Sequence, residues 1–164
     1  MSSDPVGPGS SQRDRDASGR AHNARPRDGL GRPLGRSDGG GVERVPDDLL
    51  LAPLESLAEA QRLLDAGRPF HAHEVLEASW KAAPPAERDL WQGLAQLAVG
   101  LTHRARGNPG GASTLLLRGA ANISPYADAA PYGIDVIRLV TTARAIAGDE
   151  VVPGEPPRAL TLRC

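Results

Sequence analysis

Histidine, glutamate and glutamine side chains recur at helical spacing in three stretches of this chain. The stretches are Phe70-His-Ala-His-Glu-Val-Leu-Glu-Ala-Ser-Trp80, Gln92-Gly-Leu-Ala-Gln96 and His103-Arg-Ala-Arg-Gly-Asn108. Imidazoles, carboxylates and carboxamides that lie among Leu, Ala and Trp must find partners inside a packed domain. The three stretches therefore predict either a functional site or a structural network.

The first stretch places its polar residues beside an apolar face. At about 100° per residue of helix, His73, Glu77 and Trp80 fall within one narrow arc. Glu74 lies roughly a quarter-turn further round, toward the expected solvent side, and His71 points away from His73, so we expect it at the surface. We therefore expect His73 and Glu77 to border the buried side of this helix, where a carboxylate needs a partner.

The second and third stretches continue the pattern on another helix. Gln92, Gln96 and His103 fall on one line, opposite a stripe of Leu and Trp. Periodicity alone predicts that these three side chains are exposed to solvent. If the long helix is central and covered on both faces, the line instead meets His73 and Glu77.

Three of these residues have the chemistry of metal ligands. His73, Glu77 and His103 would hold a divalent metal such as zinc, manganese or iron and leave a position open for a hydrolytic water. Glu74 follows His73 directly, as the base does in the His-Glu-x-x-His zinc motif. Glu74 is therefore the candidate catalytic base, although Glu77 stands where that motif has its second His.

Two other interpretations stay open. In one, His73 and Glu77 bond to each other one turn apart and belong to a buried network that fixes the helices, which makes the domain a non-catalytic scaffold or interaction module. In the other, the cluster is a metal-free pocket for a small molecule. The residues that would complete the network or orient a ligand are Trp80, Gln92, Gln96 and Asn108.

Helical periodicity and stop signals predict five helices, at about 47–66, 69–83, 84–106, 109–123 and 133–147. Asn108 is the expected cap of the fourth helix, and Gly67, Gly107 and Gly148 are expected to end helices. No stretch alternates strictly between apolar and polar residues, so no sheet is expected. The fold predicted is a compact all-α array, with a helical domain at 47–150 and an extended C-terminal strap or tail at 151–164.

Residues 1–46 are rich in Gly, Pro, Arg and Asp and contain no aromatic residue. Such a segment cannot offset its ordering entropy, which predicts a disordered N-terminal tail. The chain has a net charge of −1 with both signs interspersed, so we expect no nucleic acid partner. A small-molecule ligand and a homo-oligomer both stay compatible with the sequence.

The sequence also carries expectations about location. Its single cysteine is Cys164, which rules out an intrachain disulfide and fits a reducing compartment. No secretory signal begins the chain and no apolar run approaches the roughly 20 residues that span a bilayer. We therefore expect a cytoplasmic protein with no membrane association.

The order of the motifs resembles a known family. Phe-x-Ala-His-Glu-x-Leu-Glu-x-x-Trp, Gln-Gly-Leu-x-Gln-Leu-Ala-Val and His-x-x-Arg-Gly-Asn-x-x-Gly-Ala follow one another as in the prokaryotic domain-of-unknown-function family 309. The segment Tyr132-Gly-Ile-Asp135 is similar to that family's later part, so the resemblance covers roughly residues 50–147. It implies an all-helical fold and a shared His/Glu/Gln/Trp cluster, and metal-dependent hydrolysis has been suggested for the family.

Overall fold

The computed structural model describes residues 27–34, 41, 50–149 and 159–163. Within these ranges the helices are α1 (Pro53–Asp65), α2 (Pro69–Ala82), α3 (Arg88–Ala105), α4 (Pro109–Ile123) and α5 (Val136–Gly148). Short 3-10 turns lie between them: η1 (Pro85–Glu87), η2 (Ser124–Tyr126) and η3 (Pro131–Gly133). The described ranges contain no β-strand, only an isolated bridge between Arg27 and Pro33. The predicted all-α array is confirmed.

Helices α1 and α5 begin later than the sequence pattern indicates, and so does α3, whose predicted first turn is the 3-10 turn η1. Helix α1 starts at Pro53 because the residue before a proline is driven out of the helical region, and Ala52 is extended with ψ 153°. The Ala52 amide then donates to the Glu55 carboxylate at 3.1 Å. Helix α5 starts at Val136, where the Asp135 carboxylate accepts from the Arg138 amide at 2.9 Å. In both helices the local cap sets the first turn.

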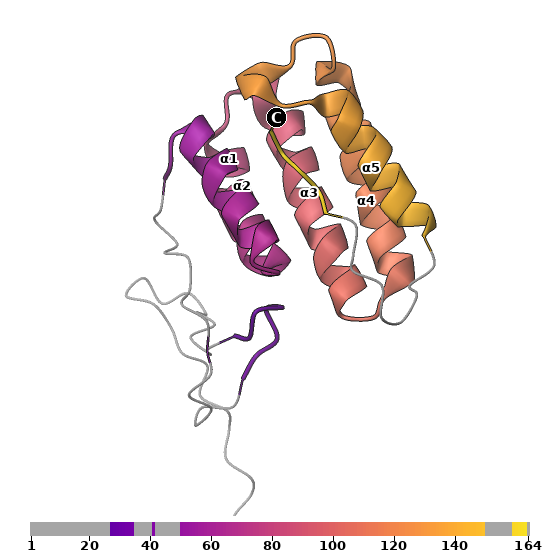
Figure 1. The fold of residues 1–164 in the computed structure, drawn as a ribbon. Coiled ribbons are helices and arrows are strands. Elements are labelled where there is room, and N and C mark those ends of the chain that lie inside the picture. Colours follow the sequence, from indigo (N-terminus) through magenta and orange to yellow (C-terminus); the bar gives the residue numbers. More distant parts are fainter. Residues whose placement is uncertain (1–26, 35–40, 42–49, 150–158, 164) are drawn as a thin grey trace, which may run out of the picture.

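Each helix packs against the next one along the chain, so α3 occupies the middle of the row (Figure 1). Buried Leu, Ile, Val and Ala side chains from all five helices form one core together with Trp91. Among the described residues, no helix combines the length and apolar character that crossing a bilayer requires. The central position of α3 means that neighbouring helices cover it on more than one side.

Residues 159–163 lie across the helices in an extended conformation (Figure 1). Leu160 and Leu162 are buried in the core. The Gln61 side chain holds the backbone on both sides, donating to the Leu160 carbonyl at 3.2 Å and accepting from the Leu162 amide at 2.7 Å. This segment therefore belongs to the core of the fold.

Two parts of the predicted organisation fall outside the described residues. The boundaries expected at 46/47 and 150/151 lie in or next to residues 42–49 and 150–158, so both stay predictions. Residues 27–34, which are part of the predicted tail, form a short turn that lies against the start of α2 (Figure 1).

Candidate functional site

The polar pair of α2 sits at the border between core and solvent, as its periodicity predicts. His73 Nε2 lies 3.7 Å from Glu77 Oε2, and Lys81 Nζ lies 3.1 Å from Glu77 Oε1. The side chains of His73 and Glu77 are 25% and 35% exposed. The residues on the inner side of the helix, Ala72, Val75 and Leu76, are fully packed. Glu77 therefore has two cationic or potentially cationic neighbours on its own helix.

Burial decides the protonation of His73. It lowers the pKa of the imidazole, while the Glu77 carboxylate and the Ala95 carbonyl of α3 act in the opposite direction. The His73 Nδ1 atom is buried without a hydrogen bond of good geometry, although the Ala95 carbonyl is near enough to favour a proton on the ring. Burial therefore favours the neutral form of the His73 imidazole, close to the Ala95 carbonyl of α3.

The glutamines of α3 contact α4, not the polar pair of α2. The Asn122 amide of α4 donates to Gln96 Oε1 at 3.1 Å and, at the longer distance of 3.5 Å, to Gln92 Oε1. All three side chains are half-buried. This carboxamide cluster, made of Gln92, Gln96 and Asn122, joins α3 to α4. A network does form, but it lies on another interface from the one that the sequence pattern suggested.

Glycines let α3 and α4 approach closely enough for that cluster. A Cβ on Gly93 would stand 2.9 Å from the Gly119 carbonyl, and one on Gly119 would stand 2.8 Å from the Gly93 carbonyl. A Cβ on Gly100 would lie 2.7 Å from Leu116 Cγ. The backbones of α3 and α4 therefore touch directly. The signal in the sequence that could have predicted this contact is the Gly93–Gly100 spacing of one heptad, on a helix that is otherwise rich in Leu.

His103 has a local role. Its Nδ1 atom lies 3.0 Å from the Asn108 amide nitrogen, and the Asn108 oxygen accepts from the Gly111 amide at 3.0 Å, which caps α4 as predicted. Because the Asn108 oxygen is occupied, its NH₂ group is the donor to His103. His103 Nδ1 is then an acceptor and the ring proton sits on Nε2. The residue is thus engaged at the α3–α4 turn.

The remaining candidates are scattered around α2. Glu74 is half-buried on that helix, and Trp80 packs half-buried against the core. Across the described parts of the chain, no three His, Cys, Asp or Glu side chains gather in a group that could hold a metal ion. The expected set of His73, Glu77 and His103 is therefore not assembled, since His103 pairs with Asn108 at the turn before α4.

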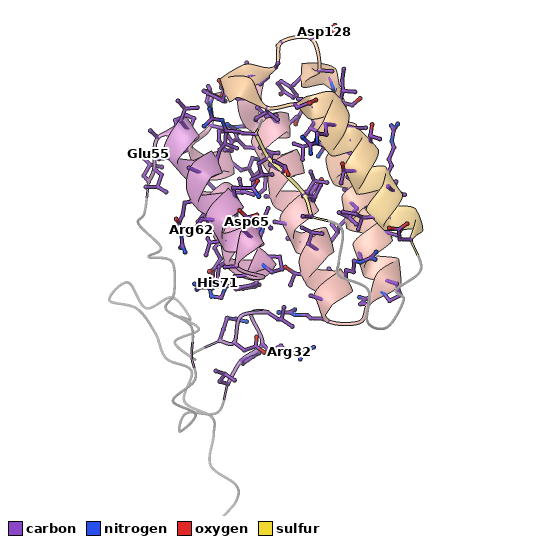
Figure 2. The ribbon with its side chains drawn as sticks, viewed as in Figure 1. Arg32, Glu55, Arg62, Asp65, His71 and Asp128 are labelled. Carbon is purple, nitrogen blue, oxygen red and sulfur yellow. The ribbon has the colours of Figure 1, made fainter. Side chains whose placement is uncertain are left out.

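His71 is buried, contrary to its expected place on the surface. It is 2% exposed, and its Nδ1 atom is buried without a hydrogen-bond partner among the described residues. Burial lowers the pKa of this imidazole, and so do the guanidinium groups of Arg68 and Arg27, whereas the Asp28 carboxylate raises it. The expectation was wrong because the helix pattern of α2 carries no information about residues 27–34, which lie over this end of the helix (Figure 2).

A second polar cluster, which the sequence pattern did not indicate, lies between η1, α3 and η3. The Glu87 carboxylate accepts from the Trp91 indole at 3.1 Å and from the Tyr132 hydroxyl at 2.8 Å. The bond to Glu87 raises the pKa of Tyr132. Tyr132 adopts a left-handed backbone with φ 58°. Neutral donors satisfy the carboxylate, so this cluster pins the loop before α5 to the core.

The comparisons with known proteins agree with the sequence motifs. Residues 57–115, from α1 to the first half of α4, match the model of a family described as a domain of unknown function (DUF309). The expected family resemblance is confirmed over this range. Over 48 residues the chain is 48% identical to the uncharacterized protein YpuF of Bacillus subtilis (strain 168), a match that covers 29% of this chain and 28% of that protein. The chain thus matches less than a third of that relative's length, and no solved structure gives a significant match.

Proposed function

We propose that this DUF309 domain is a non-catalytic helical scaffold or interaction module, in which the polar motif residues fasten helices to one another. The carboxamide cluster carries the proposal, because Asn122 joins both glutamines of the second motif across the α3–α4 interface. Half-buried amides that satisfy one another orient two helices and leave few polar groups for a substrate.

The third motif supports the same conclusion. Asn108 caps α4 with its oxygen and donates to His103 with its nitrogen. Both functions are structural, since they complete the end of α3 and the start of α4. A metal at His103 Nδ1 would have to displace the Asn108 amide.

Binding of a divalent metal or a small ligand at His73 and Glu77 is the second candidate. The observation that favours it is the partly exposed imidazole beside a carboxylate, with the two groups 3.7 Å apart. Glu74 would be the candidate base in a hydrolase of this kind. Two protein ligands fall short of the three that catalytic zinc sites use, and this shortfall places the candidate second.

Metal content of the purified full-length chain separates the two candidates. A scaffold is expected to carry no stoichiometric metal and to melt at the same temperature with and without chelator. A metal site is expected to retain zinc, manganese or iron at one equivalent, to lose it in His73→Ala and to keep it in the matched variant His103→Ala. That second result, measured by elemental mass spectrometry, would overturn the scaffold proposal.

A cytoplasmic location, the absence of a nucleic acid partner and self-association stay predictions of the sequence. The single cysteine supports the first and the near-neutral net charge supports the second. Sedimentation of the full-length chain over a range of concentrations tests the third.

A further inference from the structure

The Phe70 side chain at the start of α2 lies close to two cations and to a glycine. The guanidinium carbons of Arg27 and Arg106 lie 5.2 Å and 5.8 Å from the centre of its ring. A Cβ built on Gly31 would stand 2.2 Å from Phe70 Cγ, and Gly31 has φ +74°. Position 31 therefore requires glycine, because any side chain there would clash with the Phe70 ring and the backbone conformation is one that other residues rarely adopt.

The rest of the contact comes from Arg106 at the end of α3. Its Nε and Nη2 atoms both donate to the Leu30 carbonyl, at 3.0 Å and 2.5 Å. The face formed by Phe70 and Arg106 thus offers an aromatic platform and a bidentate donor for a backbone carbonyl. Such a pair recognises a turn by its backbone and tolerates varied side chains around a required glycine.

The turn at 27–34 is organised by its own hydrogen bonds. The Asp28 carboxylate accepts from the Leu30 amide at 2.9 Å and from the Arg32 amide at 2.8 Å. Arg27 donates to the Gly31 carbonyl at 2.6 Å. A segment that holds its shape in this way loses less conformational freedom on docking.

We propose that the Phe70–Arg106 face is a peptide-binding surface whose resident occupant is residues 27–34 of the same chain, which act as a releasable cap. Cation–π contacts and hydrogen bonds at the surface are individually weak, while fixing the backbone of each residue has an entropic cost. The docked and released states are therefore close in free energy. The turn and the helical domain belong to one chain, which keeps the effective concentration of the turn high.

Release of the cap would change the surroundings of the two neighbouring imidazole rings, those of His71 and His73. The Phe70 ring meets the His71 and His73 rings edge-on, with centroids 5.7 Å and 6.3 Å away. His71 lies at the end of the helices that faces the turn carrying Arg32 (Figure 2). The proposal holds whether or not the carboxamide cluster is structural, because no residue of the face belongs to that cluster.

Nuclear magnetic resonance of the isotope-labelled full-length chain tests the cap. In the wild type, the ring of Phe70 is expected to shift the Gly31 α-protons upfield of those of Gly29. Gly31→Ala is expected to release the turn, changing the Phe70 ring signals and raising amide exchange of Leu30 and Arg32 at least tenfold. Gly29→Ala is the matched control, because its Cβ would meet nothing nearer than Arg68 Cγ at 4.0 Å.

A synthetic peptide of residues 27–34 then tests whether the face binds. Titrated into the Gly31→Ala chain, it is expected to restore the Phe70 ring signals saturably. The Gly29→Ala chain is expected to need at least tenfold more peptide, because its own turn occupies the face. Arg106→Gln leaves the residues of the turn unchanged. It is expected to weaken binding of the peptide and, like Gly31→Ala, to raise amide exchange of Leu30 and Arg32.

Three results would overturn the proposal. One is a Gly31→Ala chain whose Phe70 signals and exchange match those of Gly29→Ala. Another is a peptide that leaves the Phe70 signals of the Gly31→Ala chain unchanged. The third is wild-type protection of Leu30 and Arg32 that depends on protein concentration, which would place the turn on a second copy of the chain.

Discussion

The α3–α4 interface and the capped start of α2 bury polar groups in opposite ways. Between α3 and α4, glycines bring the backbones together and the amides of Gln96 and Asn122 satisfy each other. At the start of α2, His71 is buried and its Nδ1 atom finds no hydrogen-bond partner within the described ranges, beneath a turn held by contacts with Phe70 and Arg106. The first region is a closed structural joint, whereas in the proposal above the second opens without breaking the core.

The contrast explains why the polar motifs divide between the two regions. A hydrogen-bonded pair in a tight interface stabilises one arrangement of helices. A buried imidazole without a hydrogen-bond partner has a desolvation cost, and this cost favours opening of the contact that covers it. Substitutions at the α3–α4 interface are therefore expected to change the stability of the fold under all conditions. Substitutions at the start of α2 are expected to act in a way that depends on pH.

The largest effect is expected from filling the glycine contact. Gly93→Val is expected to destabilise the fold by about 3 kcal/mol, because the added carbons meet the Gly119 carbonyl and Ile123. Gly110→Val is the control, since a Cβ there has nothing within 4 Å, and it is expected to stay within about 0.5 kcal/mol of wild type. Urea denaturation measures both. Equal losses would show that the helices do not meet through Gly93.

A smaller effect is expected inside the carboxamide cluster. A double-mutant cycle of Gln96→Ala and Asn122→Ala is expected to give a coupling of about 1 kcal/mol, since their amides bond at 3.1 Å. The same cycle with Gln92, whose bond is 3.5 Å long, is expected to give less than about 0.5 kcal/mol. Additive losses in the Gln96 cycle would contradict the structural joint.

The smallest effect is expected from acidification at the start of α2. Burial holds the pKa of His71 below its ordinary 6.5, so the folded state favours the neutral ring. Stability is then fully present above pH 6.5 and declines as pH falls below it, until the lowered pKa is passed.

His71→Gln isolates this residue from the other groups around it. The charged groups near it are Arg27 and Asp28 of the turn and Arg68 before α2. The free energy of unfolding of the wild type is expected to fall more between pH 7.5 and 5 than that of His71→Gln. A parallel decline in both chains would mean that His71 does not carry the pH dependence.

Much of the local structure could be predicted from the residues. Pro69 and Pro109 begin helices, Asn108 caps α4, and Gly107 ends the turn after α3 with φ +76°. These signals act over one turn of chain, so they are readable without a fold. The start of α1 was misplaced because a run of apolar and acidic residues masked the stronger effect of Pro53 on the residue before it.

The amino-acid sequence by itself determined the helices, their order, the Asn108 cap and the border position of His73 and Glu77, because each depends on neighbours within about one helical turn. Only the tertiary structure decided which helix each polar face meets. It paired Gln96 with Asn122 and buried His71 beneath residues 27–34. Such pairings join residues distant along the chain, and packing of the whole core selects among them.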